Sequence, residues 1–468
     1  MAISEIIRKF IGSSYVLHRA ALEVNERLPH SLRYRIAYGA VFFEWAAFLR
    51  ESDTWQKDKL REFQFEQLKK LLAHSMKNVP FYGRLFSDYG FNPLKMQAPE
   101  DITVLPYLSK KTVGKRLDEF IDRSVPRESL VKDRTSGSTG MALTVYKDKK
   151  ALAIYQAFLS DSLNRIGYTL KSKEVRFLYN LQVGNRRHLP FVKHGNRLTF
   201  SNQHLSEEWL PRYAEVLKRF DPEFITGSPY SVALLASFIR NRGLIPPRRI
   251  KAVIVFGETL YDWQETLLSE VFGARVFSVY SMRESAIFGG SCEYDIGIHI
   301  YPQHGLTESA ALIGDCREVI VTGFTNYAMP LLRYRTGDMV RRFEESCPRC
   351  GRHHHFVGNI DGRVNAFLFD SDGRVAPQLY QLIRFFPNVR QCQFYQDEPG
   401  KAQLRVVRAE KYSERDTPDI LSRIRATLGP MKDTLDIKIV FFDEIPKTSS
   451  GKIKVIDQKL DVRTFLSV

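Results

Sequence analysis

The sequence predicts an α/β protein with a large N-terminal domain of layered, mostly parallel sheets and a small C-terminal α+β domain. Short apolar runs alternate with helical patterns in the middle of the chain, and a denser mixture of strands and helices begins near residue 362. The 468 residues are 44% hydrophobic, which is sufficient for a large core. We therefore expect domains at 1–361 and 362–468.

Two helices are expected in the N-terminal part. The first covers 56–78, where apolar residues recur at helical spacing until Pro80 ends the pattern. The second covers 147–165 and directly follows a segment of small hydroxyl residues. The apolar residues of the first helix are Leu60, Phe63, Leu68, Leu71 and Leu72.

A strand, a helix and a second strand follow one another in the middle of the chain. The run KAVIVF at 251–256 is short, apolar and bounded by Gly257, so it predicts a buried strand. A helix is expected from Tyr261 to Phe272, and a second strand at 274–280. This alternation favours parallel strands, whose carboxyl ends share one edge of the sheet.

The small domain is predicted from a different pattern. Two short strands are expected on either side of a turn at 371–373, where Ser-Asp-Gly stands. After them we expect helices at 377–385 and 413–428, and strands at 390–396, 403–408 and 436–443.

Composition excludes several classes of protein. The formal charge of +16 is spread along the chain without an RNP, zinc-finger or homeodomain signature, so we expect no nucleic-acid partner. Five cysteines are too few for a disulfide framework and indicate a reducing compartment. The charged first ten residues are not typical of a signal peptide, and the apolar stretch 36–49 is too short for a transmembrane segment. We expect a cytoplasmic protein.

The segment TSGSTG at 135–140 consists of small residues, four of which carry a hydroxyl group. Backbone N–H groups and hydroxyls without bulky side chains are what a polyphosphate requires. A flexible linker is the alternative, and the segment lacks the lysine of a P-loop. The candidate phosphate-binding residues are Thr135, Ser136, Gly137, Ser138, Thr139 and Gly140.

Three further stretches favour a nucleotide. FGETL at 256–260 and SVYSMRES at 278–285 each end a predicted strand, where ligands of α/β sheets bind. Tyr280 can stack on a purine and Glu284 can hold a divalent metal. In YRTGD at 334–338, Asp338 can accept hydrogen bonds from a ribose.

A lysine near the C-terminus completes the set. The stretch IPKTSSGKIK at 445–454 places Lys452 in a turn of serine and glycine. A lysine on such a turn can enter a site and stabilise developing negative charge.

In this order and spacing, the motifs resemble those of the adenylate-forming superfamily of acyl-CoA synthetases, adenylation domains and luciferases. KNVPFYGRLF, DPEFITGSPYSVALLA and AMPLLRYRTGD are similar to segments of phenylacetate–CoA ligase-like proteins. CPRCGR, followed by DGRVNAFLFDSDGRVAP, resembles the capsule-biosynthesis (CapK-like) members of that branch. The resemblance covers roughly residues 56–460.

The resemblance implies a reaction in two halves. A carboxylate attacks ATP to give an acyl-adenylate and pyrophosphate, and a nucleophile such as coenzyme A then displaces AMP. Lys452 would orient the reactants, Glu284 would position Mg²⁺, and the small domain would rotate about the segment near 362–365 between the half-reactions. The residues implied for ATP and AMP, besides 135–140, are Gly257, Glu258, Tyr280, Ser281, Arg283, Asp338 and Arg363.

The chain departs from the superfamily pattern at three places. Met141 and Ala142 stand where Pro-Lys is common, and Arg283 replaces the usual threonine before the metal-binding Glu284. Arg283 either takes over a phosphate contact or faces an anionic acyl substrate. Asn365 and Ala366 stand where two acidic residues are common, which leaves the hinge residue open.

Four residues between 292 and 350 suit a structural zinc ion. Cys347 and Cys350 form a CxxC pair, and Cys292 and His299 complete a Cys₃His set of tetrahedral ligands. Such an ion would be stabilising and not catalytic. Four uncoordinated residues in ordinary loops are the alternative.

The acyl substrate and the acceptor stay open. Gly227 and the aromatic residues Tyr179, Tyr230 and Phe288 either line an apolar slot for the carboxylate or belong to the core. The first hypothesis for the acceptor is coenzyme A, and the alternative is an amine on a sugar or amino acid of a surface polysaccharide. A catalytically inactive nucleotide-binding scaffold is the third hypothesis.

Overall fold

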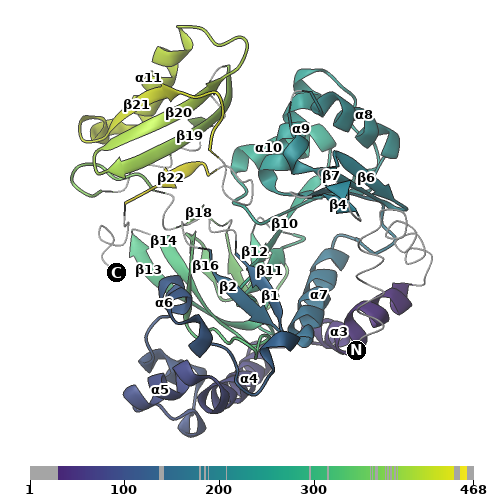
Figure 1. The fold of residues 1–468 in the computed structure, drawn as a ribbon, viewed down its shortest axis with the longest axis vertical. Helices are drawn as coiled ribbons and strands as arrows, with labels where there is room; N and C mark the ends of the chain where they lie inside the picture. The colour runs from purple at the N-terminus through teal and green to yellow at the C-terminus, as the bar shows by residue number, and fades with distance from the viewer. Residues whose placement is uncertain are drawn as a thin grey trace.

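The computed structural model describes residues 30–460 with several gaps. The gaps are 136–141, 179–180, 184–185, 188, 207, 295–296, 314–315, 359, 361, 364–366, 375, 377–378, 380–381, 384–385, 387 and 447–453. Two layers of helices enclose a large sheet, and a smaller sheet with its own helix lies at one end of the molecule (Figure 1). The predicted α/β class is confirmed. None of the described helices has the length and apolar character needed to cross a lipid bilayer.

The large sheet has ten described strands of mixed direction. Its central strands β10, β9, β8, β3 and β7 pair in parallel, and the strands on both flanks pair antiparallel. The mostly parallel pairing that the sequence predicted is therefore limited to the centre. In spatial order the strands are β16 (Phe343–Glu344), β17 (His355–Val357), β12 (Ile298–Ile300), β11 (Phe288–Ser291), β10 (Arg275–Ser281), β9 (Ala252–Phe256), β8 (Phe224–Gly227), β3 (Glu174–Leu178), β7 (Arg197–Ser201) and β6 (Phe191–His194).

Helices cover both faces of this sheet. On β9, Val253 and Val255 pack in one core and Ala252 and Ile254 in another, and all four are buried. A strand buried on both faces carries a continuous apolar run, which accounts for KAVIVF. The helices are α3 (His30–Ser52), α4 (Lys57–Asn78), α5 (Pro80–Asp88), α6 (Lys110–Lys115), α7 (Lys149–Asn164), α8 (Leu210–Phe220), α9 (Pro229–Asn241) and α10 (Asp262–Phe272).

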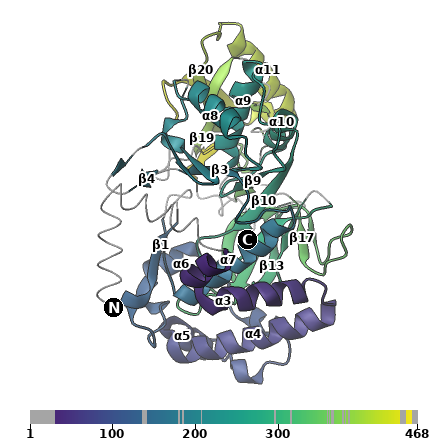
Figure 2. The same cartoon turned by 90° about the vertical axis from the view of Figure 1, so that its right-hand side faces the viewer.

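The N-terminal helices form the base of the molecule. Helices α3 and α4 lie side by side there (Figure 2), and their Phe48 and Phe63 rings have centroids 5.1 Å apart. The helices predicted at 56–78 and 147–165 are confirmed as α4 and α7. Pro80 not only ends the first pattern but begins α5, because proline is well suited to the first turn of a helix.

Besides the C-terminal sheet, three smaller sheets of described residues accompany the large one. Strands β1 (Val131–Arg134) and β2 (Thr144–Lys147) form a hairpin around the hydroxyl-rich segment, and β4 (Gln182–Val183) pairs with β5 (Arg186–Arg187). An antiparallel sheet contains β13 (Gly305–Ile313), β14 (Cys316–Gly323), β15 (Tyr334–Val340) and β18 (Gly362–Arg363). Because β18 pairs with β15, strand pairing of the large body continues past the proposed boundary at 361, which stays a prediction.

The C-terminal sheet contains most of the elements expected there. Strands β19 (Val389–Glu398), β20 (Lys401–Arg408) and β21 (Asp436–Phe441) and helix α11 (Asp416–Leu428) confirm the predictions for those segments. Strand β22 (Ile456–Gln458), which was not predicted, pairs with β19. The turn at 371–373 is present, closed by a hydrogen bond of 3.1 Å from the Gly373 N–H to the Asp370 carbonyl. Most of the helix predicted at 377–385 lies outside the described residues.

Candidate active site

The carboxyl ends of β9 and β10 lie next to each other. In their parallel register Val279 is level with Phe256, so Tyr280 comes level with Gly257. Gly257 has a φ of 78°, which turns the chain away from the sheet and favours glycine. Glu258 follows it and is half-buried. The predicted adenine-binding residues from the two strands therefore share one edge.

Tyr280 and Asp338 meet although they belong to different sheets. The Tyr280 hydroxyl donates a hydrogen bond of 2.8 Å to Asp338 Oδ2. The two residues are only 9% and 5% exposed. The Asp338 backbone N–H donates to Thr336 Oγ1 at 3.0 Å, and this bond fixes the backbone of β15 at the residue that carries the carboxylate. The structure thus joins the predicted purine-stacking and ribose-binding residues.

Glu284 lies close to this pair. It is 5% exposed, and the Tyr334 hydroxyl donates to its Oε1 over 3.4 Å. One carboxylate, completed by substrate phosphates and water, is a usual way for a protein to hold Mg²⁺. The donor set at Glu284 therefore fits that ion. Ser281 Oγ lies 3.3 Å from the Tyr155 hydroxyl of α7.

The hydroxyl-rich segment is closed at its base by Thr135. Its backbone N–H donates to the Leu143 carbonyl at 2.9 Å, and its Oγ1 accepts from the Leu143 N–H at 2.8 Å. Ser136, Gly137, Ser138, Thr139 and Gly140 lie outside the described residues, so their phosphate contacts stay predictions.

The structure shows fewer contacts for the remaining residues that were predicted to bind the nucleotide. Arg283 Nη1 donates to Asp133 Oδ1 at 2.8 Å, a contact that sequence reasoning missed. Arg363 stands opposite Asp338 in the pairing of β18 with β15. Lys452 lies outside the described residues.

The described candidates for the acyl pocket belong to different elements of the chain. Tyr179 lies outside the described residues, and Gly227 ends β8 where a Cβ atom would lie 3.0 Å from Phe177 and Val232. Tyr230, at the start of α9, accepts a hydrogen bond of 3.1 Å from Gln391 Nε2 of the C-terminal sheet. Burial raises the pKa of Tyr230 to about 12, and the neighbouring Glu258 adds to the shift.

Phe288 matches the second of the two alternatives, a place in the core. It is fully buried and packs against Phe158, Tyr155 and Tyr301, so it belongs to the core between β11 and α7. A cavity of about 370 Å³ lies beside α10, β10 and β11. Its lining includes Leu260, Ser278, Ser291 and Tyr294 and none of the described candidates Gly227, Tyr230 and Phe288.

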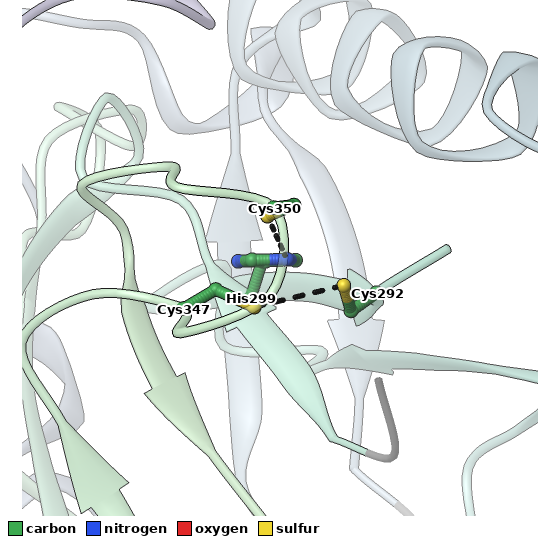
Figure 3. A group of neighbouring side chains, drawn as sticks. All are labelled: Cys292, His299, Cys347 and Cys350. Carbon is green, nitrogen blue, oxygen red and sulfur yellow. Dashed lines mark hydrogen bonds between the residues drawn. The ribbon is translucent and has the colours of Figure 1, made fainter. Parts of the chain in front are cut away.

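The four predicted zinc ligands come together. Their ligand atoms all lie within 4.8 Å of one another (Figure 3). Cys292 Sγ is 3.7 Å from Cys347 Sγ, and Cys350 Sγ is 3.3 Å from His299 Nε2. Zinc–sulfur bonds of about 2.3 Å in a tetrahedron place two sulfurs roughly 3.7–3.8 Å apart, so the geometry fits zinc.

The electrostatics of the zinc cluster, defined as these four residues, agree with that fit. Burial and the cations Arg165 and Arg352 lower the pKa of His299 to about 3, which keeps the imidazole neutral and able to bind a metal. Burial raises the pKa of Cys292 to about 12, so a metal would have to displace its proton. Gly351, with a φ of 71°, allows the turn that brings Cys350 back toward Cys347.

An arginine next to the zinc cluster connects it to the helical base. The Arg352 guanidinium donates two hydrogen bonds to the Asp53 carboxylate and two to the Glu293 carboxylate, all of 2.9 Å. Sequence reasoning missed this contact, because Asp53 and Arg352 are 299 residues apart and neither stands in a recognisable pattern.

Comparisons with known proteins agree with the motifs. A family model of the CapK C-terminal domain matches residues 372–459. The chain is similar to a phenylacetate-coenzyme A ligase of Thermus thermophilus, with 29% identity over 358 residues that cover 72% of this chain and 78% of that protein. It is also similar to protein CapK of Staphylococcus aureus, with 25% identity over 430 residues that cover 89% and 92% of the two chains.

Solved structures share the fold. A 2-hydroxyisobutyryl-CoA ligase in the postadenylation state, in complex with R3-HIB-AMP, superimposes with a TM-score of 0.68 at 16% sequence identity. The superposition covers 89% of this chain and 93% of that one, so both the large body and the C-terminal sheet have counterparts.

Proposed function

Because the chain belongs to the adenylate-forming superfamily, in the branch of the phenylacetate–CoA ligases and CapK, we propose that it is an ATP-dependent, AMP-forming carboxylate ligase. It activates a carboxylate to an acyl-adenylate with release of pyrophosphate and then transfers the acyl group to coenzyme A. The observation that carries this proposal is the hydrogen bond between Tyr280 and Asp338, beside Glu284, at the carboxyl edge of β9 and β10.

In the first half-reaction, Tyr280 stacks on the adenine and Asp338 accepts hydrogen bonds from the ribose. The segment 135–140 donates hydrogen bonds to the β,γ-phosphates. Glu284 would hold Mg²⁺, which supplies positive charge to the phosphate oxygens. Lys452 orients the carboxylate and the α-phosphate for in-line attack, which supplies the proximity that the bimolecular step otherwise lacks.

In the second half-reaction, the C-terminal domain rotates and removes Lys452 from the site, so that coenzyme A can reach the acyl-adenylate. The contact between Gln391 and Tyr230 supports this proposal, because it is a hydrogen bond between the two bodies that a rotation can break and replace. The boundary near 361–362 and the hinge within 362–365 are part of the same proposal.

The other two hypotheses are less well supported. An amine acceptor is not favoured, because a relative that covers 72% of the chain is named as a coenzyme A ligase. An inactive scaffold is less well supported, because the chain retains both Glu284 and Lys452, which a protein that only binds a nucleotide does not need.

Pyrophosphate release tests the proposed function. We expect release that depends on one carboxylate when a panel of acids is supplied with ATP and Mg²⁺, and an acyl-CoA product when coenzyme A is added. A product formed with an amine but not with coenzyme A would favour the amide ligase. No release from any acid, although the protein is folded, would contradict a ligase.

Replacing Asp338 with asparagine tests the ribose contact. We expect Asp338→Asn to weaken ATP and AMP binding alike, by about tenfold or more, because a charged acceptor contributes more to a hydrogen bond than a neutral one. The asparagine oxygen can still accept from Tyr280, so the fold is retained. Calorimetric titration of both nucleotides measures the effect, with the exposed Asp262→Asn on α10 as control. Unchanged AMP binding would remove Asp338 from the ribose site.

A further inference from the structure

Three charged side chains join two segments of the nucleotide site that are far apart in sequence. Arg283 Nη1, one residue before Glu284, donates to Asp133 Oδ1 at 2.8 Å. Lys147 Nζ lies 3.2 Å from Asp133 Oδ2. Asp133 belongs to β1 and Lys147 to β2, so both stand in the hairpin that carries the hydroxyl-rich segment. This group of Asp133, Lys147 and Arg283 is called the charge triad below.

Asp133 is a fixed anion at the centre of the triad. Its Oδ1 also accepts from the Arg134 backbone N–H at 2.8 Å, so both carboxylate oxygens have donors. Burial alone would raise the pKa of Asp133, but Lys147, the Arg134 N–H and Arg283 together hold it below its ordinary value. Asp133 is therefore ionised, and two cations around one anion leave the triad with net positive charge.

The exposure of the three side chains differs in a way that suggests their roles. Lys147 is only 8% exposed, Asp133 is 26% exposed and Arg283 is 65% exposed. Among the residues that the structure describes, the Arg283 guanidinium pairs with Asp133. An exposed ion pair contributes little to stability, so variants that lose this one should remain folded. Further N–H groups of the guanidinium remain for a ligand.

The hydroxyl-rich segment itself supplies no positive charge. Between Thr135 and Leu143 the sequence has no lysine or arginine. A triphosphate carries several negative charges, and arginine is well suited to bind phosphate oxygens in pairs. The bond to Asp133, two residues before Thr135, holds the Arg283 guanidinium next to the base of the hairpin.

We propose that Arg283 contacts the β,γ-phosphates of ATP, and that Asp133, supported by Lys147, is the positioning residue that fixes the guanidinium there. The inference rests on the proposed function and adds to it the source of charge for the polyphosphate. It also decides between the two roles left open for Arg283, since the hairpin carries the segment expected to bind phosphate and not the acyl group.

Binding of ATP and AMP to the full chain tests this inference. AMP lacks the β,γ-phosphates, so the ratio of the two dissociation constants isolates the contact. We expect Arg283→Gln to weaken ATP binding by about tenfold or more, with AMP binding changed less than about twofold. Asp133→Asn should weaken ATP selectively by a smaller factor, and Arg283→Lys should restore part of the loss. The exposed Lys132→Ala on β1 changes the charge of the same hairpin and should leave the ratio unaltered.

The double variant tests the positioning role. If Asp133 acts through Arg283, Asp133→Asn combined with Arg283→Gln should bind ATP no more weakly than Arg283→Gln alone. Additive losses, equal losses for ATP and AMP, or tighter ATP binding by Asp133→Asn would overturn the inference. A chain that releases pyrophosphate but keeps its nucleotide ratio in every variant refutes only the triad. A wild-type chain that binds no ATP refutes the proposed function and the triad together.

Discussion

Replacing Cys347 with serine is expected to release zinc, present at about one ion per purified chain, and to lower the midpoint of thermal unfolding by roughly 5–10 °C. Changing even the surroundings of a metal ligand costs about 10–100-fold in metal affinity, so loss of a ligand should cost at least that factor. A hundredfold loss is about 2.7 kcal/mol, and each kcal/mol shifts the midpoint by roughly 2–4 °C in domains of 150–250 residues.

The physical reason for this effect is the position of the zinc cluster. Cys347 is buried and belongs to the loop between β16 and β17, whereas Cys292 follows β11 and His299 lies in β12. A zinc ion would therefore link the antiparallel flank of the large sheet to the loop that carries Arg352, and through Arg352 to Asp53 at the base. Without the ion, thiols and a neutral imidazole remain buried with weak contacts only.

A matched control separates the metal from the sulfur atom. Cys316 is also buried but stands in β14, outside the zinc cluster, so Cys316→Ser should keep the zinc content of the wild type. Elemental analysis and thermal unfolding with and without a chelator measure both effects. A stable wild-type protein that contains no zinc would refute the metal hypothesis, and the four residues would then be a buried polar cluster.

Much of the fold around the site could be predicted from local patterns. The runs at 251–256 and 274–280 are apolar on both faces, and their strands β9 and β10 differ from the prediction by at most one residue at each end. The motifs at the ends of those strands carried enough chemical character for Tyr280, Glu284 and Asp338 to be proposed as one site. The shared edge of β9 and β10 accounts for the place of Tyr280, whereas its contact with Asp338 depends on the packing of a second, antiparallel sheet against that edge.

The strands on the antiparallel flank of the large sheet could not be predicted from local patterns in the same way. Strand β11 consists of Phe288, Gly289, Gly290 and Ser291, and this sequence lacks the run of apolar residues that is typical of a buried strand. Gly290 is required because α7 passes so close that a Cβ atom would collide with Ser162. The aromatic Phe288 was compatible with a pocket or with the core, and only the position of α7 decides for the core.

Side-chain contacts over long separations could not be predicted either. Arg283 and Asp133 are 150 residues apart, and each stands in a segment that is explained by its own motif. The same holds for Gln391 and Tyr230, which belong to different bodies of the molecule. Sequence patterns of charge report neighbours on one helix or one strand, whereas these contacts depend on how separate sheets pack.

Replacing Lys452 with alanine is expected to lower carboxylate-dependent pyrophosphate release by about 10²–10³-fold or more, because a single donor aimed at developing charge contributes that much to a rate. Lys452 itself is not among the described residues, but described residues on both sides of it, Asp443 and Lys454, accept hydrogen bonds from side chains of β19 in the C-terminal sheet. Ile445 is fully buried, and the Lys454 carbonyl accepts a bond of 2.9 Å from Gln393 Nε2. Fixed flanking residues reduce the conformational entropy that is lost when a lysine between them is ordered.

The pattern of lost and retained steps distinguishes a catalytic lysine from a structural one. Lys452→Ala should bind ATP within about twofold of the wild type and should still form thioester from a synthetic acyl-adenylate, because the lysine acts in the first half-reaction only. Lys454→Ala is the matched control, since Lys454 is engaged with Asp457 at 2.9 Å and should change the rate little. Wild-type pyrophosphate release by Lys452→Ala would remove the lysine from the mechanism. Equal loss of both half-reactions would assign it a structural role in the C-terminal domain.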